Sequence, residues 1–227
     1  MDSEFKELIS SFTKEDYENG LVDLHIHTTF SDGTGDIREL AAQAEAMGYK
    51  YIAFCDHNTV EGYRSCRSSI VIPAAEFDVW CGCVFLHLLA YGIDVNSEEL
   101  KPFFAKTKRE TEADWVRIFA KRDIKKLINA IHTAGGIAVL AHPACCWTLS
   151  LDRLVKKLVS YGLDGIEVYY PYRRHRGIIK FHYAGSVEKI ADKYNLIKTG
   201  GTDLHGKKLH NHRVSQAGTT LPANKPL

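Results

Sequence analysis

Short apolar segments alternate with turn residues and helical patterns along most of the 227 residues. Seven of these segments have the length and apolar content of buried strands. The predicted strands cover residues 21–26, 50–55, 70–75, 84–90, 137–141, 165–170 and 196–199. Apolar positions at helical spacing predict helices over residues 4–12, 37–47, much of 98–134, 151–161 and 176–194.

The helix predicted over residues 37–47 has the clearest boundaries. Ile37 and Leu40 begin an apolar face that continues at helical spacing. Asp36 stands at the position of an N-terminal cap, with a glutamate three residues later as in a capping box. Gly48 is a typical residue for the end of a helix.

Strands that alternate with helices indicate parallel βα units. With about seven such strands, a closed or distorted barrel is favoured over an open sheet. The fold class that we predict is α/β, a distorted (β/α)7 TIM-like barrel. A chain of 227 residues suits one substantial domain, so we expect a single domain over residues 1–227.

Composition excludes several classes of function. The net charge is +1, which gives no overall attraction to long duplex nucleic acid or to an anionic membrane. No run approaches the roughly 18 apolar residues of a membrane span. Residues 1–19 have no apolar signal-peptide core, so we expect a cytoplasmic protein. The six cysteines lack the spacing of a zinc site, and we expect mostly buried, reduced thiols.

Polar side chains of metal-binding types recur at or near the ends of predicted strands. The carboxyl ends of parallel barrel strands converge on one mouth, so residues far apart in sequence would meet there. The candidate metal ligands are His25, His27, Asp32, His57, Glu76, His87, His142, Asp203 and His205.

Six imidazoles and three carboxylates are too many for one tetrahedral ion, and they suit two or three ions. Nitrogen and oxygen ligands favour Zn, Mn or Fe over Ca or Mg. Each residue alone has a structural alternative: His87 could be a core histidine, and Asp32 could be a turn residue. Nine such residues together are hard to explain as structural residues of the core, because the burial of an unpaired polar group costs on the order of several kcal/mol.

These motifs resemble those of the PHP family, named for polymerase and histidinol phosphatase. The SDG and AYGID segments are most similar to the stand-alone branch, which includes nucleoside 3′,5′-bisphosphate phosphatases and 5′→3′ oligoribonucleotide exonucleases. The matching segments are DLHIHTTFSDG (23–33), CDHNTVEGY (55–63), PAAEFDV (73–79), FLHLLAYGID (85–94), GGIAVLAHP (135–143) and GGTDLHG (200–206).

The resemblance implies a PHP fold with a trinuclear metal centre in which Glu76 bridges two ions. The first ion would be held by His25, His27, Glu76 and Asp203, the second by Glu76, His87 and His142, and the third by Asp32, His57 and His205. One departure is the segment 96–134, where close relatives insert a helical subdomain that is reduced here. Because that insertion helps to shape the substrate entrance, its reduction affects the identity of the substrate more than the catalytic reaction.

The expected reaction is hydrolysis of a phosphomonoester, with a nucleotide or small-metabolite phosphate as substrate and a metal-bridging hydroxide as nucleophile. Asp56 could orient a ligand or cap a turn. Arg173, Arg174 and His175 follow a predicted strand and are candidates for binding the phosphate.

Other interpretations remain open at this point. Tyr169, Tyr170 and Tyr172 could stack on a nucleobase, although core packing is equally plausible for the first two. One alternative function is a 5′→3′ exonuclease on short RNA or DNA. Another is a non-catalytic metal-binding regulatory module. A deacylase of the amidohydrolase type is disfavoured, because it usually needs a lysine bridge that we do not find at a strand end.

Overall fold

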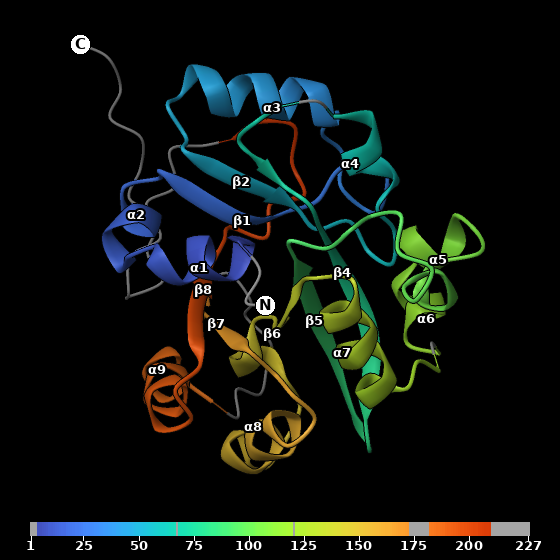
Figure 1. Ribbon diagram of the computed structural model, residues 1–227, viewed down its shortest axis with the longest axis vertical. Coiled ribbons are helices and arrows are strands. Elements are labelled where there is room, and N and C mark those ends of the chain that lie inside the picture. The colour runs from blue at the N-terminus through green and yellow to red at the C-terminus, as the bar shows by residue number, and fades with distance from the viewer. Residues whose placement is uncertain (1–3, 67, 120, 173–181, 210–227) are drawn as a thin grey trace.

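The computed structural model describes residues 4–66, 68–119, 121–172 and 182–209. Its strands form two sheets that curve around a shared interior (Figure 1). The three-stranded sheet has the order β1 (Val22–Ile26), β2 (Tyr51–Phe54), β3 (Val71–Ile72). The five-stranded sheet has the order β4 (Ala74–Cys81), β5 (Val84–Tyr91), β6 (Ile137–Leu140), β7 (Gly165–Tyr169), β8 (Ile197–Gly200).

Helices cover the outside of both sheets (Figure 1). α3 and α4 lie over the three-stranded sheet, while α7, α8 and α9 surround the five-stranded sheet. The helices are α1 (Glu4–Ser11), α2 (Lys14–Glu18), α3 (Ile37–Ala46), α4 (Glu61–Ser65), the 3₁₀ helix η1 (Lys101–Phe103), α5 (Arg109–Glu112), α6 (Asp114–Arg117), α7 (Ile124–Thr133), the 3₁₀ helix η2 (Pro143–Cys145), α8 (Leu151–Val159) and α9 (Ala184–Lys193). This arrangement confirms the predicted TIM-like α/β fold.

The two sheets meet at two seams, each marked by an isolated bridge. Ile26 pairs with Leu204, which joins the end of β1 to the chain that follows β8. His57 pairs with Glu76, which joins the chain after β2 to β4. The barrel is therefore closed by short contacts rather than by full ladders, and candidate metal ligands lie at or beside both of them.

The expectation of parallel strands throughout is wrong around β4 and β5. The predicted strand 70–75 divides at Pro73, and its second part continues as β4 to Cys81. β4 then pairs with β5 in an antiparallel hairpin, and β5 pairs antiparallel with β6. Gly82 has a φ of 67° in the two-residue turn, a conformation that glycine adopts without strain. Glu76 therefore lies within a strand rather than at its end.

Segment 98–134 contains less helix than the pattern indicated. Among the described residues of this segment, only α7 is a regular helix of several turns, and η1, α5 and α6 are single turns. The short helices α2 and α4 were not predicted. Thr13 and Asp16 form a reciprocal capping box at α2, a signal that was present in the sequence. The expectation of a single domain over residues 1–227 stays a prediction.

Helix α3 follows its pattern closely. Asp36 caps it by accepting hydrogen bonds from the backbone N–H groups of Arg38 and Glu39, and Ile37 and Leu40 are buried against the three-stranded sheet. Because α3 packs on β1 and β2, it fixes the outer side of the strands whose ends carry the first candidate ligands.

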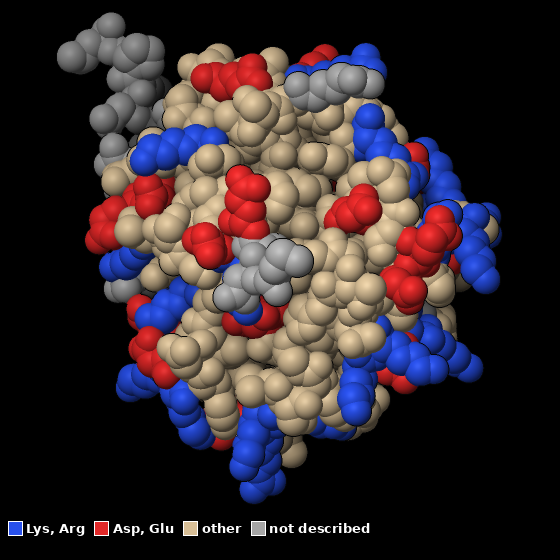
Figure 2. Space-filling model, viewed as in Figure 1, with Lys and Arg blue, Asp and Glu red and all other residues tan. Residues whose placement is uncertain are grey.

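Surface charge agrees with the small net charge. On the face shown in Figure 2, basic and acidic side chains are interspersed around the periphery, with no extended basic surface among the described residues in view.

None of the helices formed by described residues is long and apolar enough to cross a bilayer. All six cysteines are free thiols.

Candidate metal centre

All nine predicted ligands lie in one connected cluster. They form overlapping groups in which one ligand atom of each residue lies within 4.8 Å of the others. The groups are His27, Asp32, His57 and His205; His25, His27 and Asp203; His25, Glu76 and His142; and His57, Asp78 and His87. Asp78 is the one member that the sequence analysis did not name.

Glu76 lies at the middle of the cluster and is 1% exposed. Five histidine nitrogens lie within 3.5 Å of its two carboxylate oxygens, divided between them. They belong to His25, His27 and His57 at Oε2 and to His87 and His142 at Oε1. Burial would raise the pKa of this carboxyl, but the surrounding imidazoles lower it well below its ordinary value. Glu76 is therefore an anion with ligand groups on both of its oxygens.

Asp203 faces the histidine pair of β1 from across the seam with β8. Its Oδ1 lies 3.2 Å from His27 Nε2 and 3.6 Å from His25 Nε2, while its Oδ2 accepts a hydrogen bond of 2.7 Å from the Tyr170 hydroxyl. Asp203 has a φ of 51° and His142 a φ of 25°, in the left-handed region that favours glycine. Two ligand candidates thus occupy strained backbone, as is common at functional sites.

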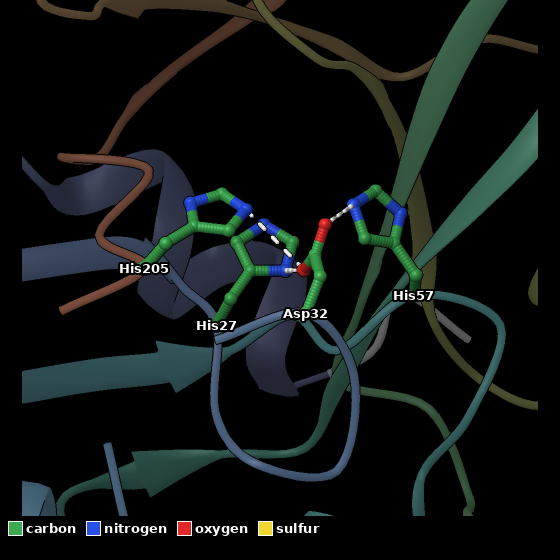
Figure 3. A group of neighbouring side chains, drawn as sticks. All are labelled: His27, Asp32, His57 and His205. Carbon is green, nitrogen blue, oxygen red and sulfur yellow. Dashed lines mark ion pairs between the residues drawn. The ribbon is translucent and has the colours of Figure 1, made fainter. Parts of the chain in front are cut away.

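Asp32 lies between the three histidines of the third group, with His57 on one side and His27 and His205 on the other (Figure 3). Its Oδ1 lies 3.3 Å from His205 Nε2 and 3.5 Å from His27 Nδ1, and its Oδ2 lies 3.6 Å from His57 Nε2. The four side chains come from the loop after β1, the loop after β2 and the chain after β8. The predicted third set is therefore present as a spatial group, with His27 beside it.

One buried nitrogen in the cluster, Nε2 of His27, fits metal ligation better than hydrogen bonding. His27 Nε2 is buried and makes no hydrogen bond, although oxygens of Glu76 and Asp203 each lie 3.2 Å away. Burial lowers the pKa of His27, yet these two carboxylates raise it to about 10. A buried nitrogen that faces two carboxylates without bonding to either is what a shared cation would leave.

Asp78 is a residue that the sequence analysis missed. It is fully buried, with Oδ1 3.4 Å from His57 Nδ1 and 3.2 Å from His87 Nε2. Asn58 donates to its Oδ2 through the side-chain amide. Burial would raise the pKa of Asp78, but His57, His87 and Arg117 bring it to about 2. The Glu76-x-Asp78 spacing, which puts both carboxylates on one face of a strand, was a usable signal.

Arg117 was also missed. Its side chain is 6% exposed, and Nη1 donates to Asp32 Oδ2 at 2.9 Å, while Nη2 pairs with Asp114. Its Nε lies 3.8 Å from Asp78 Oδ1 and makes no hydrogen bond. Nothing in the sequence singled out this arginine, because it belongs to a segment predicted as helix without a role.

Glu167 supports the cluster from β7. Its Oε1 accepts a hydrogen bond of 3.0 Å from His25 Nδ1, and its Oε2 accepts one of 2.7 Å from the backbone N–H of His142. Glu167 is completely buried. A glutamate inside the apolar segment GIEVYY was a signal in the sequence, since an unpaired carboxylate is rarely buried.

Asp56 holds the loop that carries Asp32. Its carboxylate accepts hydrogen bonds from the Thr28 N–H, the Thr28 hydroxyl and the Ser31 hydroxyl, at 2.7–2.8 Å. Ser31 is in turn 3.4 Å from Asp32 Oδ1. These contacts support a positioning role for Asp56, exerted on the Asp32 loop rather than on the neighbouring His57.

The other expected substrate contacts have two outcomes. Arg173, Arg174 and His175 lie outside the described residues. The three tyrosines are buried: Tyr169 stacks on Tyr17 with ring centroids 5.2 Å apart, and the Tyr172 hydroxyl donates to the Glu167 carbonyl. For the tyrosines, burial and contacts within the protein favour the alternative of core packing over stacking on a base.

The cluster opens into a cavity of about 760 Å³. One part of its lining is polar and is formed by the ligand candidates and Arg117. The remainder is mainly apolar or sulfur-containing. Apart from Asp114, it comprises Trp80, Cys83, Phe85, Leu86, Ile118, Cys145, Cys146 and Trp147. A cavity of this size suits a small molecule with its polar group at the cluster.

The PHP domain model matches residues 23–143, which is just over half of the chain. The chain belongs to the PHP domain family. It is 24% identical over 272 residues to the phosphoribosyl 1,2-cyclic phosphate 1,2-diphosphodiesterase of Eggerthella lenta, covering 88% of this chain and 99% of the relative. It is 24% identical over 216 residues to a 5′-3′ exoribonuclease of Haemophilus influenzae, covering 64% of this chain and 78% of the relative.

Among solved structures, the fold is similar to that of a protein from Bifidobacterium adolescentis described as a metal-dependent phosphoesterase. The TM-score is 0.66 at 21% identity, over 82% of this chain and 88% of the other. The family and these likenesses confirm the resemblance to PHP phosphoesterases. The chain is a hydrolase of phosphoester bonds.

Proposed function

We propose that the chain hydrolyses a phosphomonoester of a nucleotide or small metabolite at a centre of two or three divalent ions. The observation that carries this proposal is Glu76, a buried anion with histidine nitrogens against both carboxylate oxygens. One carboxylate between two sets of imidazoles is the ligand arrangement of a multinuclear site.

Three ligand sets are available. The first is His25, His27, Glu76 and Asp203, the second is Glu76, His87 and His142, and the third is Asp32, His57 and His205. Zn, Mn and Fe suit these nitrogen and oxygen donors. Divalent ions bound there would activate water and offset the charge that develops on the phosphate.

Protein groups would orient these ligands. Asp78 faces Nδ1 of His57, which leaves Nε2 of that ring directed at Asp32 and Glu76. Glu167 likewise accepts a hydrogen bond from Nδ1 of His25, which leaves Nε2 of that ring directed at Glu76. Carboxylates in these positions fix the tautomer and the direction of a ligand histidine.

Arg117 is the candidate for binding the phosphate among the described residues. It is the one lysine or arginine that lines the described part of the cavity, and its buried Nε has no hydrogen-bond partner. A guanidinium beside Asp32 could contact phosphate oxygens in a bidentate manner. The small phosphorylated substrate would then lie between Arg117 and the ligand cluster.

A second candidate is a 5′→3′ exonuclease on short RNA or DNA. The similarity to the Haemophilus influenzae exoribonuclease favours it. This function differs from the first candidate because the cavity would have to admit an oligonucleotide rather than a single nucleotide or small metabolite. A non-catalytic metal-binding module would keep the ligand cluster without turnover.

The experiment that tests these candidates combines metal analysis with hydrolysis. Purified protein would be loaded with Zn²⁺, Mn²⁺ or Fe²⁺, and bound ions would be counted by mass spectrometry. Phosphate release from mononucleotides, sugar phosphates and 5′-phosphorylated oligomers would then be compared. Two or more ions and release from monomers, both reduced in His57→Ala, are the expected result. Release from oligomers alone would replace the first candidate by the second, and ions without any turnover would favour the non-catalytic module.

A further inference from the structure

A line of aromatic rings leads away from the ligand cluster along the β4–β5 hairpin. The Phe85 ring lies 5.3 Å from the ring of His87, edge-on at 88°. Trp80, the cross-strand partner of Phe85, has its ring 5.3 Å further along, inclined at 54°. Phe85 and Trp80 are half-buried and line the cavity. An apolar surface thus begins beside a ligand histidine and continues outward.

This surface is held in place. The indole N–H of Trp80 donates a hydrogen bond of 2.8 Å to the backbone carbonyl of Ile118, which ties the hairpin to the segment after α6. The rings of Trp80 and Phe85 also contact each other across the two strands. A ring that is already ordered loses little conformational entropy when a ligand packs against it.

A third aromatic side chain is exposed on the same cavity. Trp147 is 76% exposed and lines the cavity from the chain after η2. Large aromatic side chains left open to water at a cavity mouth often mark a binding surface. We refer to Trp80, Phe85 and Trp147 together as the aromatic wall.

The charges in the cavity are distributed unevenly. Arg117 pairs with Asp32 at the ligand cluster, and the described lining beyond it contains no lysine or arginine. Asp114 adds a negative charge to that lining. A second phosphate beyond the cluster would therefore lack a cationic partner among the described lining residues, whereas a neutral aromatic group would find apolar contacts.

We propose that the aromatic wall binds a planar aromatic group, such as a nucleobase, in the alcohol portion of the substrate. A single phosphate would then lie at the ligand cluster. This inference rests on the proposed function and narrows its substrates to monophosphates of alcohols that carry an aromatic ring. Stacking of a base on an aromatic side chain corresponds to a gain in affinity of about 10-fold or more.

Binding of non-hydrolysable phosphonates to the metal-loaded protein tests the wall directly. Benzylphosphonate, cyclohexylmethylphosphonate and methylphosphonate would be compared by titration calorimetry. We expect benzylphosphonate to bind about 10-fold more tightly than methylphosphonate, and more tightly than the cyclohexyl compound. Equal affinity of the benzyl and methyl compounds, or no binding of either, overturns the wall as a binding site. Equal affinity of the benzyl and cyclohexyl compounds overturns aromatic recognition.

Two variants and one control localise the effect. Phe85→Leu keeps an apolar side chain but removes the ring, and the benzyl-to-methyl affinity ratio should fall about 5-fold. Trp147→Leu should also lower the ratio, and its exposed position makes it tolerant of substitution if Phe85→Leu fails to fold. The control is Trp115→Leu: Trp115 is 66% exposed and lies outside the cavity lining, so the ratio should not change. A ratio unchanged in every folded wall variant overturns the proposal.

Hydrolysis separates this inference from the proposed function. Adenosine 5′-monophosphate and ribose 5-phosphate carry the same type of primary phosphate ester, with and without a base. We expect kcat/KM to be about 10-fold higher for the nucleotide. Equal, measurable turnover of both supports the phosphomonoesterase and overturns the wall. If neither is hydrolysed, the phosphonate affinities still decide on the wall.

Discussion

Asp78 Oδ1 lies 3.4 Å from His57 Nδ1, while the other nitrogen of this ring faces Asp32 and Glu76. The same oxygen lies 3.2 Å from His87 Nε2. One buried carboxylate therefore faces two histidines that belong to different proposed ligand sets. Each ring has its other nitrogen directed at Glu76.

The first prediction concerns this shared carboxylate. Asp78→Asn removes the charge that directs both rings, and the affinity for divalent ions should fall about 10- to 100-fold. Titration of the metal-free protein with Zn²⁺ or Mn²⁺ measures it. Glu98→Gln, which changes an acidic side chain that is 77% exposed, serves as the control. Wild-type affinity in Asp78→Asn would show that the two rings are oriented without it.

The second prediction concerns Arg117. Arg117→Lys keeps the charge but loses the planar fork that can bind two phosphate oxygens. The inhibition constant of inorganic phosphate should rise about 10-fold, which corresponds to the loss of one good charged hydrogen bond. Competition assays measure this constant, with the exposed Arg109→Lys as the matched substitution. An unchanged constant would remove Arg117 from phosphate binding.

The third prediction concerns the seam between β8 and β1. A Cβ atom at Gly201 would lie 2.3 Å from the Cβ of His25 and 2.5 Å from its backbone nitrogen. Gly201→Ala should therefore lower the free energy of unfolding by about 3 kcal/mol, because the backbone must shift to relieve the clash. Urea denaturation checks this value. Gly185→Ala in α9, where an added Cβ meets nothing within 4 Å, should be neutral or slightly stabilising. Similar midpoints for both variants would contradict the close approach.

The fourth prediction concerns pH and a carboxylate remote from the cluster. Burial alone would raise the pKa of Asp164, but bonds from His132, at 2.7 Å, and the Ala138 N–H lower it below the ordinary 3.8. Its stabilising contribution is therefore present above pH 3.8 and is lost as the pH falls toward the lower pKa of the folded state.

Asp164→Asn should cost about 1 kcal/mol at pH 7, a modest value because the pair is partly open to solvent. The difference from wild type should shrink as the pH falls below 3.8. Urea denaturation between pH 3 and pH 7 measures it, with Asp192→Asn as a control at an exposed carboxylate. A difference that stays constant over this range would mean that Asp164 has the same pKa in both states.

The sequence predicted the fold class because each regular βα unit repeats a strong pattern. It did not predict the β4–β5 hairpin, since a continuous apolar strand reads the same in parallel and antiparallel pairing. The two-residue turn at Gly82 was the local feature that reverses the chain. Single-turn helices such as α5 and α6 carry too few residues for a helical period to emerge.

The candidate site was predictable where residues of metal-binding types end or follow strands, as with His25 and His142. Asp78 was missed because the predicted strand ended at residue 75, whereas β4 continues to Cys81. Glu167 was interpreted as part of an apolar strand, although a buried carboxylate there needs a partner. Arg117 was beyond prediction. Its contact with Asp32 joins positions 85 residues apart and depends on the path of an irregular segment.

The position of the ligand cluster at the two seams of the barrel has a consequence for stability. Proposed ligands lie on both sides of each seam: His57 follows β2 of one sheet, Glu76 belongs to β4 of the other, and a single bridge joins these two segments. Ions bound between them would act as removable cross-links between the two halves of the barrel. Chelation of the ions should then lower the melting temperature of the protein. It should also speed amide hydrogen exchange, first along the seams and only later in the helices, because the barrel would open before any helix unfolds.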